Sequence, residues 1–338
     1  MKVELHCWNV RGINSPLKRR KVYAHLRTLK ADISFLQETH IKITAAKILR
    51  PSWASHVFQS NFSTKARGVA ILIKKTIAFI HKQTISDHRG RYLIVKGELN
   101  SVPVTLINVY GPNFDDPIFF QNLFNTIPDM SNSNIILGGV LNCVLDPVLD
   151  RQHSQTSSSK SSVTLNNLMQ SYNLVDIWRL LNPTAKYFSF FSAVHKSYSR
   201  IDYFILDSKH LTQIVDCKYH YILISDHAPV SVKLKLNYKR GEFSWRLNNA
   251  TLKDKEFCSY LSNQIDQYVQ MNDTGEVDDS TLWEAMKAVI RGHIISYEAA
   301  EKRKSKERLT EIDNQLADME VLYREGNKPE LLKKITAL

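Results

Sequence analysis

The chain has 338 residues, of which 43% are hydrophobic and 23% charged, with a formal net charge of +12 at pH 7, and this length allows two domains, or one large domain with an appendage. No run approaches the roughly 18 uninterrupted apolar residues of a membrane span, and the N-terminus lacks the apolar core of a signal peptide. The four scattered cysteines show no metal-binding spacing, so we expect an intracellular protein of the nucleus or cytoplasm, with reduced thiols and no zinc site.

Residues 1–236 alternate strand-like and helical segments. The strand-like runs are 3–10, 33–37, 69–73, 92–99, 104–110, 134–137, 201–206 and 230–236. Several follow one another through short turns, which favours antiparallel pairing. Helices are expected from Pro16, over 118–127, and over 163–172 with Ser162 as N-cap. This order predicts two sheets flanked by helices, an α+β fold.

Residues 237–338 have a different character and are predicted to be mainly helical, with Ser280 capping one long helix. Apolar residues over 309–322 repeat at coiled-coil spacing, but for barely two heptads, which is too short to predict a coiled coil. We expect an arm that packs on a neighbour outside this chain. The sequence therefore predicts two domains, 1–236 and 237–338.

The positive charge is confined to the first of these regions. Residues 239–338 hold 16 Lys+Arg and 18 Asp+Glu, a net charge of −2, which leaves a net charge of +14 on residues 1–238. A folded domain with this excess attracts polyanions, since each neutralised phosphate releases condensed counterions. Charge alone leaves a merely basic domain and a nucleic-acid-binding domain about equally favoured.

Polar side chains follow the strand-like runs at several points. They lie in Trp8-Asn9-Val10-Arg11-Gly12, Gln37-Glu38-Thr39-His40, Tyr110-Gly111-Pro112-Asn113, Arg200-Ile201-Asp202-Tyr203 and Ser225-Asp226-His227. Each string alone is weak evidence, but together they place carboxylates, amides, a phenol and an imidazole at one edge of a sheet sandwich. Hydrolysis of a phosphodiester requires such a set. One or two carboxylates hold a hard cation, hydrogen-bond donors stabilise the negative charge that develops on the phosphate, and a general base deprotonates the attacking water.

The chain resembles the endonuclease/exonuclease/phosphatase superfamily, and most closely the N-terminal endonuclease of LINE-type (non-LTR) retrotransposon polyproteins. The resemblance covers about residues 1–236 and rests on WNVRGI, QETH, GVAILI, NVYGPN, ILGG-x-x-NCVLDP, SFFSAVHKSYSRIDYFIL and SDHAPV, in family order. It implies a four-layer α/β/β/α sandwich of two mostly antiparallel sheets, similar to DNase I. Residues 237–338, including SWRLN and WEAMKAVIRGHIISY, resemble the helical segment that leads toward reverse transcriptase, so we expect a fragment of a longer polyprotein.

The resemblance also implies roles for individual residues. Glu38 would be the main ligand of Mg²⁺, with Mn²⁺ as a possible substitute, and Asn9 and Asp226 would lie at the metal. Tyr110 and Asn142 would bond phosphate oxygens, and His227, oriented by Asp202, would stabilise charge on the phosphate. The expected DNA contacts are Arg11, Asn113, Ser189, His195, Lys196, Tyr198 and Arg200, with residues 192–199 forming a hairpin that probes the DNA groove.

Val140 departs from the family pattern, which is Gly-Gly-Asp-Phe-Asn where this chain has Gly138-Gly139-Val140-Leu141-Asn142. The aspartate of the pattern orients and deprotonates the attacking water, and valine can do neither. Loss of a positioned general base lowers a rate by about 10²–10⁴. We expect the neighbouring Asp146 and Asp150 to be poor replacements because they lie beyond the strand end.

Three functions follow, in order of preference. The first is a DNA endonuclease that leaves a 3′-hydroxyl for primed reverse transcription, impaired in this copy by Val140. The second is a catalytically inactive module that still binds nucleic acid. The third is a phosphatase of the same superfamily acting on a small phosphoester, such as an inositol phosphate or a lipid head group.

Overall fold

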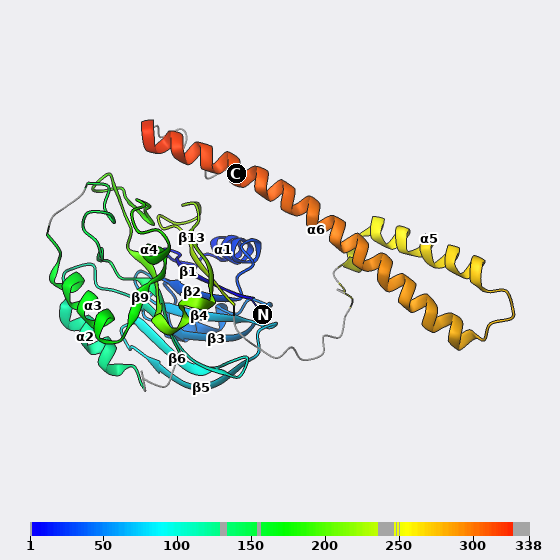
Figure 1. Ribbon diagram of the computed structural model, residues 1–338, viewed down its shortest axis with the longest axis horizontal. Coiled ribbons are helices and arrows are strands. Elements are labelled where there is room, and N and C mark those ends of the chain that lie inside the picture. The colour runs from blue at the N-terminus through cyan, green and yellow to red at the C-terminus, as the bar shows by residue number, and fades with distance from the viewer. Residues whose placement is uncertain are drawn as a thin grey trace. The chain divides into compact units, whose positions relative to one another are not determined.

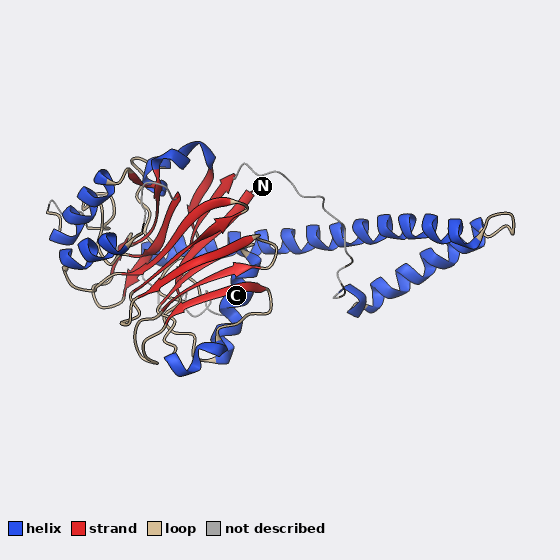
Figure 2. Ribbon diagram, turned by 90° about the horizontal axis from the view of Figure 1, so that it is seen from below, coloured by secondary structure: helices blue, strands red, loops and turns tan. Residues whose placement is uncertain are grey.

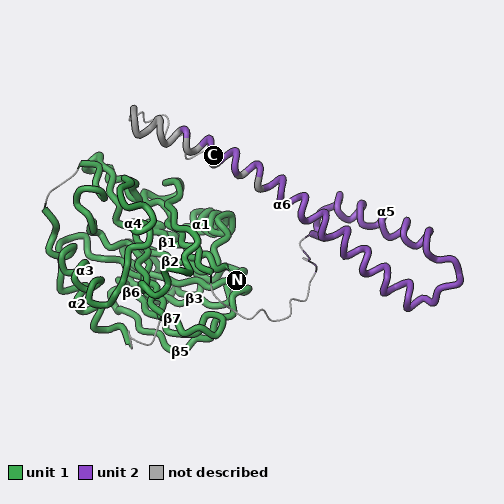
Figure 3. The backbone as a smooth tube through the Cα atoms, in the orientation of Figure 1, with its two compact units in different colours: residues 1–239 green, residues 240–338 purple. Residues whose placement is uncertain are grey.

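The computed structural model describes residues 2–128, 134–153, 157–235, 247, 249 and 251–326. The chain divides into two compact units, residues 1–239 and 240–338 (Figure 3). The domain boundary expected between residues 236 and 237 lies outside the described residues.

The first sheet of unit 1 has six strands in the order β13-β14-β1-β2-β4-β3. Its strands are β1 (Lys2–Asn9), β2 (Ile33–Gln37), β3 (Ala54–Ser60), β4 (Val69–Lys74), β13 (Ile214–Tyr219) and β14 (Val230–Lys235). Neighbouring strands are antiparallel except β1 and β2, which are parallel. Because β1 and β2 run in the same direction, Asn9 and Glu38 come to the same edge of the sheet.

The second sheet has six strands in the order β5-β6-β7-β8-β12-β9. Its strands are β5 (Phe79–Ser86), β6 (Tyr92–Leu99), β7 (Val102–Tyr110), β8 (Asn134–Val140), β9 (Leu174–Asp176) and β12 (Asp202–Asp207). Only β7 and β8 are parallel neighbours, and Tyr110 is the register partner of Val140 at their common end. A separate two-stranded hairpin consists of β10 (Phe190–Ser192) and β11 (Ser197–Ser199).

Helices cover the outer faces of the two sheets (Figures 1 and 2). α1 (Pro16–Thr28) packs its buried Val22 and Leu26 with Trp8 and Leu36 of the first sheet. α2 (Pro117–Thr126) and α3 (Lys160–Ser171) pack on the second sheet, and α4 (Ile177–Leu181) follows β9. Short 3-10 segments occupy Ile43–Ile48 and Ser208–Gln213. The predicted four-layer α+β sandwich is confirmed.

The core between the two sheets is apolar in its middle and polar near one edge. Residues such as Leu5, Phe35 and Leu106 form the apolar part. Closer to the edge, Gln37 Nε2 of β2 donates to Asn108 Oδ1 of β7 at 2.6 Å, and both side chains are fully buried. Satisfied buried amides of this kind fix the position of one sheet against the other.

Ser159, and not the expected Ser162, caps α3. Ser159 Oγ accepts the backbone N–H of Ser162 at 3.1 Å, and the helix begins at Lys160. Asp115 adds a second cap, since its carboxylate accepts the N–H groups of Lys160 and Ser161. The run of serines before the helix offers several equivalent caps, so the sequence could not select among them.

Unit 2 is a pair of helices, α5 (Lys255–Asn272) and α6 (Asp279–Gly326), preceded by a 3-10 turn at Thr251–Lys253. Phe257 and Ile294 are buried between them, and Tyr260 Oη lies 2.8 Å from His293 Nδ1. Asp278, not the expected Ser280, caps α6, because its carboxylate accepts the N–H of Thr281. The predicted helical character is confirmed, and no helix in the described part of the chain is long and apolar enough to cross a membrane.

Candidate active site

The two sheets bring Asn9, Glu38, Tyr110, Asn142 and His227 to one edge of unit 1. Several backbones there adopt the left-handed region, with φ of +44° at Arg11, +51° at Glu38 and +53° at Asn142. Non-glycine residues in this region are uncommon, and they often mark functional sites whose geometry the surrounding fold enforces.

Glu38 lies directly after β2 and is held on both of its carboxylate oxygens. Asn9 Nδ2 donates to Oε1 at 3.0 Å, and His40 Nε2 lies 3.2 Å from Oε2. Burial alone would raise the pKa of Glu38, but the hydrogen bonds from His40, Asn9 and Tyr110 and the nearby His227 outweigh it and lower this pKa to about 2. Glu38 is therefore an ionised carboxylate at any physiological pH.

Tyr110, Asn113 and Asn142 continue the network on the second sheet. Tyr110 donates from its hydroxyl to Asn113 Oδ1 at 3.3 Å, and Asn142 Nδ2 donates to the same oxygen at 2.9 Å. Burial and the charge of Glu38 raise the pKa of Tyr110. The phenol therefore keeps its proton and is a donor, as binding of a phosphate oxygen requires.

His227 and Asp202 form a buried pair. The Nδ1 atom of His227 lies 2.8 Å from Asp202 Oδ2, while its Nε2 atom lies 3.3 Å from Asn9 Nδ2. Burial lowers the pKa of His227, but the charge of Asp202 and its hydrogen bond overcome this effect and raise the pKa above its ordinary value. Because Asp202 fixes Nδ1, Nε2 is the ring atom that faces the other site residues.

These contacts form one continuous chain of polar contacts across both sheets. It runs through Asn142, Asn113, Tyr110, Glu38, Asn9, His227 and Asp202. Asp226 lies beside this chain and pairs with Arg11, whose Nη1 is 3.0 Å from Asp226 Oδ2. The structure thus brings these residues together at one edge of the sandwich, and the roles expected for them stay predictions.

Val140 has no polar group to add to this network. It ends β8 between its register partners Tyr110 and Asp202, and its side chain is fully buried in the apolar cluster between the sheets. Asp146 cannot take over, because its Oδ1 accepts the N–H groups of Val148 and Leu149 in its own turn.

Arg200, which we expected to contact DNA, is fully buried instead. Its guanidinium makes two 2.8 Å bonds to Asp150 and lies 2.6 Å from Asp176. Arg179 also pairs with Asp150. Arg200 is therefore part of the interior of the fold, and its ion pairs occupy the carboxylate of Asp150.

Ser189 is likewise not placed for the expected contact with phosphate. Its side chain is fully buried, and its Oγ accepts the backbone N–H groups of Ile201 and Asp202 at 3.0 and 3.1 Å. The hydroxyl therefore positions the start of β12, and with it Asp202, from inside the protein.

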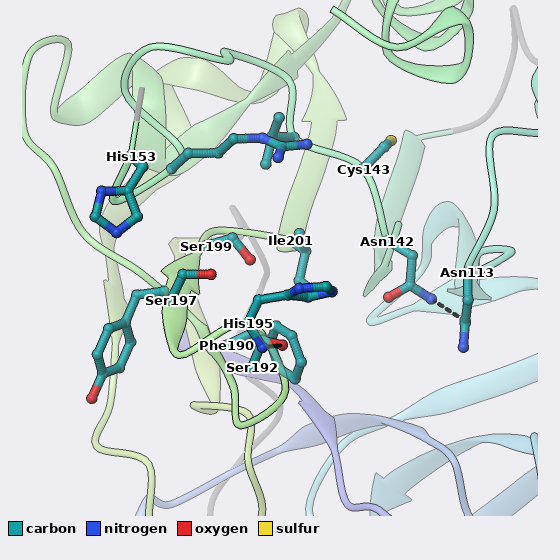
Figure 4. Close-up of a pocket in the computed structure, with 13 residues that line it drawn as sticks. Asn113, Asn142, Cys143, His153, Phe190, Ser192, His195, Ser197, Ser199 and Ile201 are labelled. Carbon is teal, nitrogen blue, oxygen red and sulfur yellow. Dashed lines mark hydrogen bonds between the residues drawn. The ribbon is translucent and has the colours of Figure 1, made fainter. Parts of the chain in front are cut away.

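The hairpin of β10 and β11 borders a cavity of about 630 Å³ next to the site. Figure 4 shows Asn142 and Asn113 on one side of this cavity and His195 and Ser197 of the hairpin across from them. His195 and Lys196 are exposed at the tip, and Tyr198 lines the cavity from β11. The expected DNA contacts of the hairpin, unlike Ser189 and Arg200, are accessible.

The donor set fits a hard, hydrated cation better than an ion enclosed by protein ligands. In the described residues no group of three or more His, Cys, Asp or Glu side chains could hold a metal ion. Mg²⁺, however, is commonly bound by one or two carboxylates together with waters and substrate phosphates. Glu38 offers an ionised carboxylate for this role, Asn9 an amide, and Asp226 a second carboxylate nearby.

His40 belongs to the QETH string, but no role was expected for it from the sequence. In the structure, the His40 ring contacts the Glu38 carboxylate and thereby helps to fix its position. Phe190, whose ring centroid lies 4.5 Å from that of His227, was also missed. Neither contact is visible from sequence spacing, since both depend on how the strands end.

Residues 7–227 match the Endonuclease/Exonuclease/phosphatase family. The chain belongs to this family. It is also 27% identical over 264 residues, 76% of its length, to the Transposon TX1 uncharacterized 149 kDa protein of Xenopus laevis, and it spans 20% of the length of that relative.

Several solved nuclease structures share the fold at low sequence identity. The catalytic domain of APE2 from Xenopus laevis has a TM-score of 0.58 at 20% identity, covering 69% of this chain and 92% of that one. The AP endonuclease LMAP from Leishmania major has a TM-score of 0.57 at 20% identity, covering 70% and 88%. The 3′-5′ exonuclease NExo from Neisseria meningitidis has a TM-score of 0.55 at 21% identity, covering 69% and 100%.

Proposed function

We propose that this chain is the endonuclease domain of a LINE-type retrotransposon polyprotein, joined to part of the helical segment that leads toward a reverse transcriptase. Its substrate is DNA, and its reaction is hydrolysis of one phosphodiester to leave a 3′-hydroxyl. The observation that carries the proposal is the chain of polar contacts from Asn142 to Asp202, with the ionised Glu38 at its centre. The relative from a transposon and the net charge of +14 on residues 1–238 support it.

Each group of the site has a role in this reaction. A divalent cation, Mg²⁺ or Mn²⁺, would be held by Glu38 with Asn9 and Asp226, and would supply a Lewis acid for the phosphate. When the substrate binds, the Tyr110 hydroxyl and the Asn142 amide would exchange their hydrogen bonds to Asn113 Oδ1 for hydrogen bonds to phosphate oxygens. With Nδ1 held by Asp202, a protonated His227 would donate from Nε2 to a phosphate oxygen that gains negative charge.

Val140 stands where the carboxylate that activates water is expected. A buried isopropyl group can neither accept a proton nor orient a water molecule. We therefore propose that the DNA-binding function persists and that nicking is slower by about 10²–10⁴, as for loss of a positioned general base.

The test combines nicking with binding. Supercoiled plasmid is incubated with the protein and Mg²⁺, with EDTA as the control, and binding to a short duplex is measured by fluorescence anisotropy at several salt concentrations. We expect salt-dependent binding and slow nicking that EDTA abolishes. Absence of both DNA binding and nicking would overturn the proposal.

The second candidate, favoured by Val140 alone, is a DNA-binding module with no catalysis. It predicts the same salt-dependent binding, but no nicking above the EDTA control at any enzyme concentration. The two candidates therefore differ in one measurement on the unaltered chain.

A further inference from the structure

A second cavity, of about 470 Å³, lies at the site on the side of Glu38 and Tyr110. The β3–β4 connection, the start of β6 and the segment after β7 line it. Its lining residues are Glu38, His40, Lys65, Ala66, Arg67, Arg91, Tyr110, Asn113 and Phe114. Asn113 also lines the hairpin cavity, so the two cavities adjoin at this residue.

Arg67 and Arg91 bring two like charges close together in this cavity. Burial, and next the positive charge of Arg67, lower the pKa of Arg91. Among the described residues, no carboxylate lies within ion-pair distance of Lys65, Arg67 or Arg91, although the ionised Glu38 lines the same cavity and Asp87 and Asp116 lie further off. Neighbouring cations without an ion-pair partner are an arrangement that a bound anion stabilises.

The structure holds these two arginines in place. Arg91 donates from Nη1 to the carbonyl oxygen of Gly111 at 2.9 Å, and its guanidinium stacks on the Tyr110 ring at 5.6 Å. Arg67 stacks over Phe62 at 4.8 Å and has a φ of +61°. Guanidinium groups fixed by stacking lose little entropy on binding a phosphate, and their planar donors match its oxygens.

Phe114 provides an apolar surface on the same cavity. Its side chain is 67% exposed, although it directly follows Asn113 of the chain of polar contacts. An aromatic ring beside paired cations is how proteins hold single-stranded nucleic acid, because each base stacks on a ring while the backbone lies on positive charge.

We propose that this cavity binds the nucleotide of the cleaved strand that is adjacent to the scissile phosphate, with its own phosphate on Arg67 and Arg91 and its base on Phe114. This inference rests on the proposed function. The occupant is a nucleotide and not a free anion, because the cationic groups and the exposed ring line one cavity that adjoins the phosphate-binding residues.

Binding in EDTA to a fluorescein-labelled DNA strand, measured by anisotropy, provides the test. For Arg67→Gln, the negative slope of the logarithm of the association constant against the logarithm of the salt concentration should become shallower by about 1, as for loss of one phosphate contact. The matched control is Lys235→Gln, which removes an exposed charge at the end of β14 that is remote from His227. Its slope should equal that of the unaltered chain.

Phe114 is tested with a set of strands that carry one abasic position each, moved along the sequence. The unaltered chain should lose about five-fold or more in affinity at one position, the loss expected for a stacked base. Phe114→Ala should bind the intact strand more weakly, by the same factor that the unaltered chain loses at the sensitive abasic position. Its affinity should not depend on where the abasic position lies. Ile80→Ala, which removes an exposed apolar side chain of β5 away from the cavity, should keep the sensitivity.

The outcomes separate this inference from the proposed function. If the unaltered chain binds DNA with a clear salt dependence but Arg67→Gln and Phe114→Ala behave as their controls do, the cavity is not a nucleotide subsite while the proposed function stands. If the unaltered chain does not bind DNA, both fail. Circular dichroism of each variant shows whether a loss of binding reflects loss of folding, and a folded Arg67→Gln with an unchanged slope counts against the inference.

Discussion

Replacing Val140 with aspartate tests the candidate site most directly. Val140 ends β8 as the register partner of both Tyr110 and Asp202, so a carboxylate there would lie beside these two site residues. We expect V140D to nick supercoiled plasmid in Mg²⁺ about 10²- to 10⁴-fold faster than the unaltered chain, because a positioned general base is restored.

The same substitution should lower the stability of unit 1. Full burial of a valine side chain stabilises a fold by about 1.5–3 kcal/mol, and Val140 is 0% exposed. The new carboxyl group also loses water, and it lies beside Asp202, so its pKa should be raised. We expect a loss of about 3 kcal/mol, which for a unit of this size lowers Tm by about 6–12 °C, with partial recovery in Mg²⁺.

Two control variants make the result specific. V140N has nearly the same shape as V140D but cannot act as a base, so it should be destabilised without gaining activity. Glu38→Gln in the V140D background should remove the gain, because the metal ligand is lost. The reasoning is refuted if V140D is folded and binds DNA but nicks no faster than the unaltered chain, or if V140N gains as much.

Three further predictions concern other parts of the structure. Glu38→Gln should weaken Mn²⁺ binding at least ten-fold in calorimetry, whereas the unaltered chain should still bind Mn²⁺ near pH 4 because the pKa of Glu38 is about 2; equal affinities would exclude Glu38 as a ligand. Arg200→Met leaves Asp150 without its buried partner and should lower the free energy of unfolding by about 3–5 kcal/mol in urea titrations; a loss under about 1 kcal/mol would contradict this. Burial lowers the pKa of His25 to about 4 and that of His220 to about 3, so below pH 6.5 only the unfolded chain takes up these protons. The contribution of the two neutral histidines to the free energy of unfolding should be fully present above pH 6.5 and should decrease as the pH falls toward 4. The double variant with glutamine at both positions should show a smaller change in the free energy of unfolding between pH 7 and 5.

The strands that the sequence predicted are those that are buried on both faces. β2 and β4 consist almost wholly of buried apolar residues, and both were found within one residue of their observed bounds. β3, β5, β13 and the three-residue edge strand β9 were missed. β3 and β5 lie at sheet edges and carry polar side chains such as His56 and Lys82, and β13 is an edge strand with the exposed Lys218, so neither a continuous apolar run nor clean alternation marks them.

The residues that gather at the site could be predicted because the strand ends converge. Which other polar side chains are buried away from the site could not be predicted. Asn9, Glu38 and Tyr110 each follow an apolar run, which suffices to place them at one edge. Ser189 and Arg200 occur in equally suggestive strings, yet both are fully buried. Whether a polar side chain faces solvent or pairs inside the protein depends on distant partners, such as Asp150 for Arg200.

The buried ion pairs of Arg200 have a consequence for the β10–β11 hairpin, which contacts the segment that carries Asp150. Arg151 bridges to Ser199, and Gln152 exchanges hydrogen bonds with Tyr198, so the segment bearing Asp150 is tied to the stem of the hairpin. The tip, residues 193–196, is exposed. Natural variation in the length or composition of this tip could therefore alter the choice of DNA target while the scaffold below keeps its shape, which makes the tip a suitable site for grafting foreign loops.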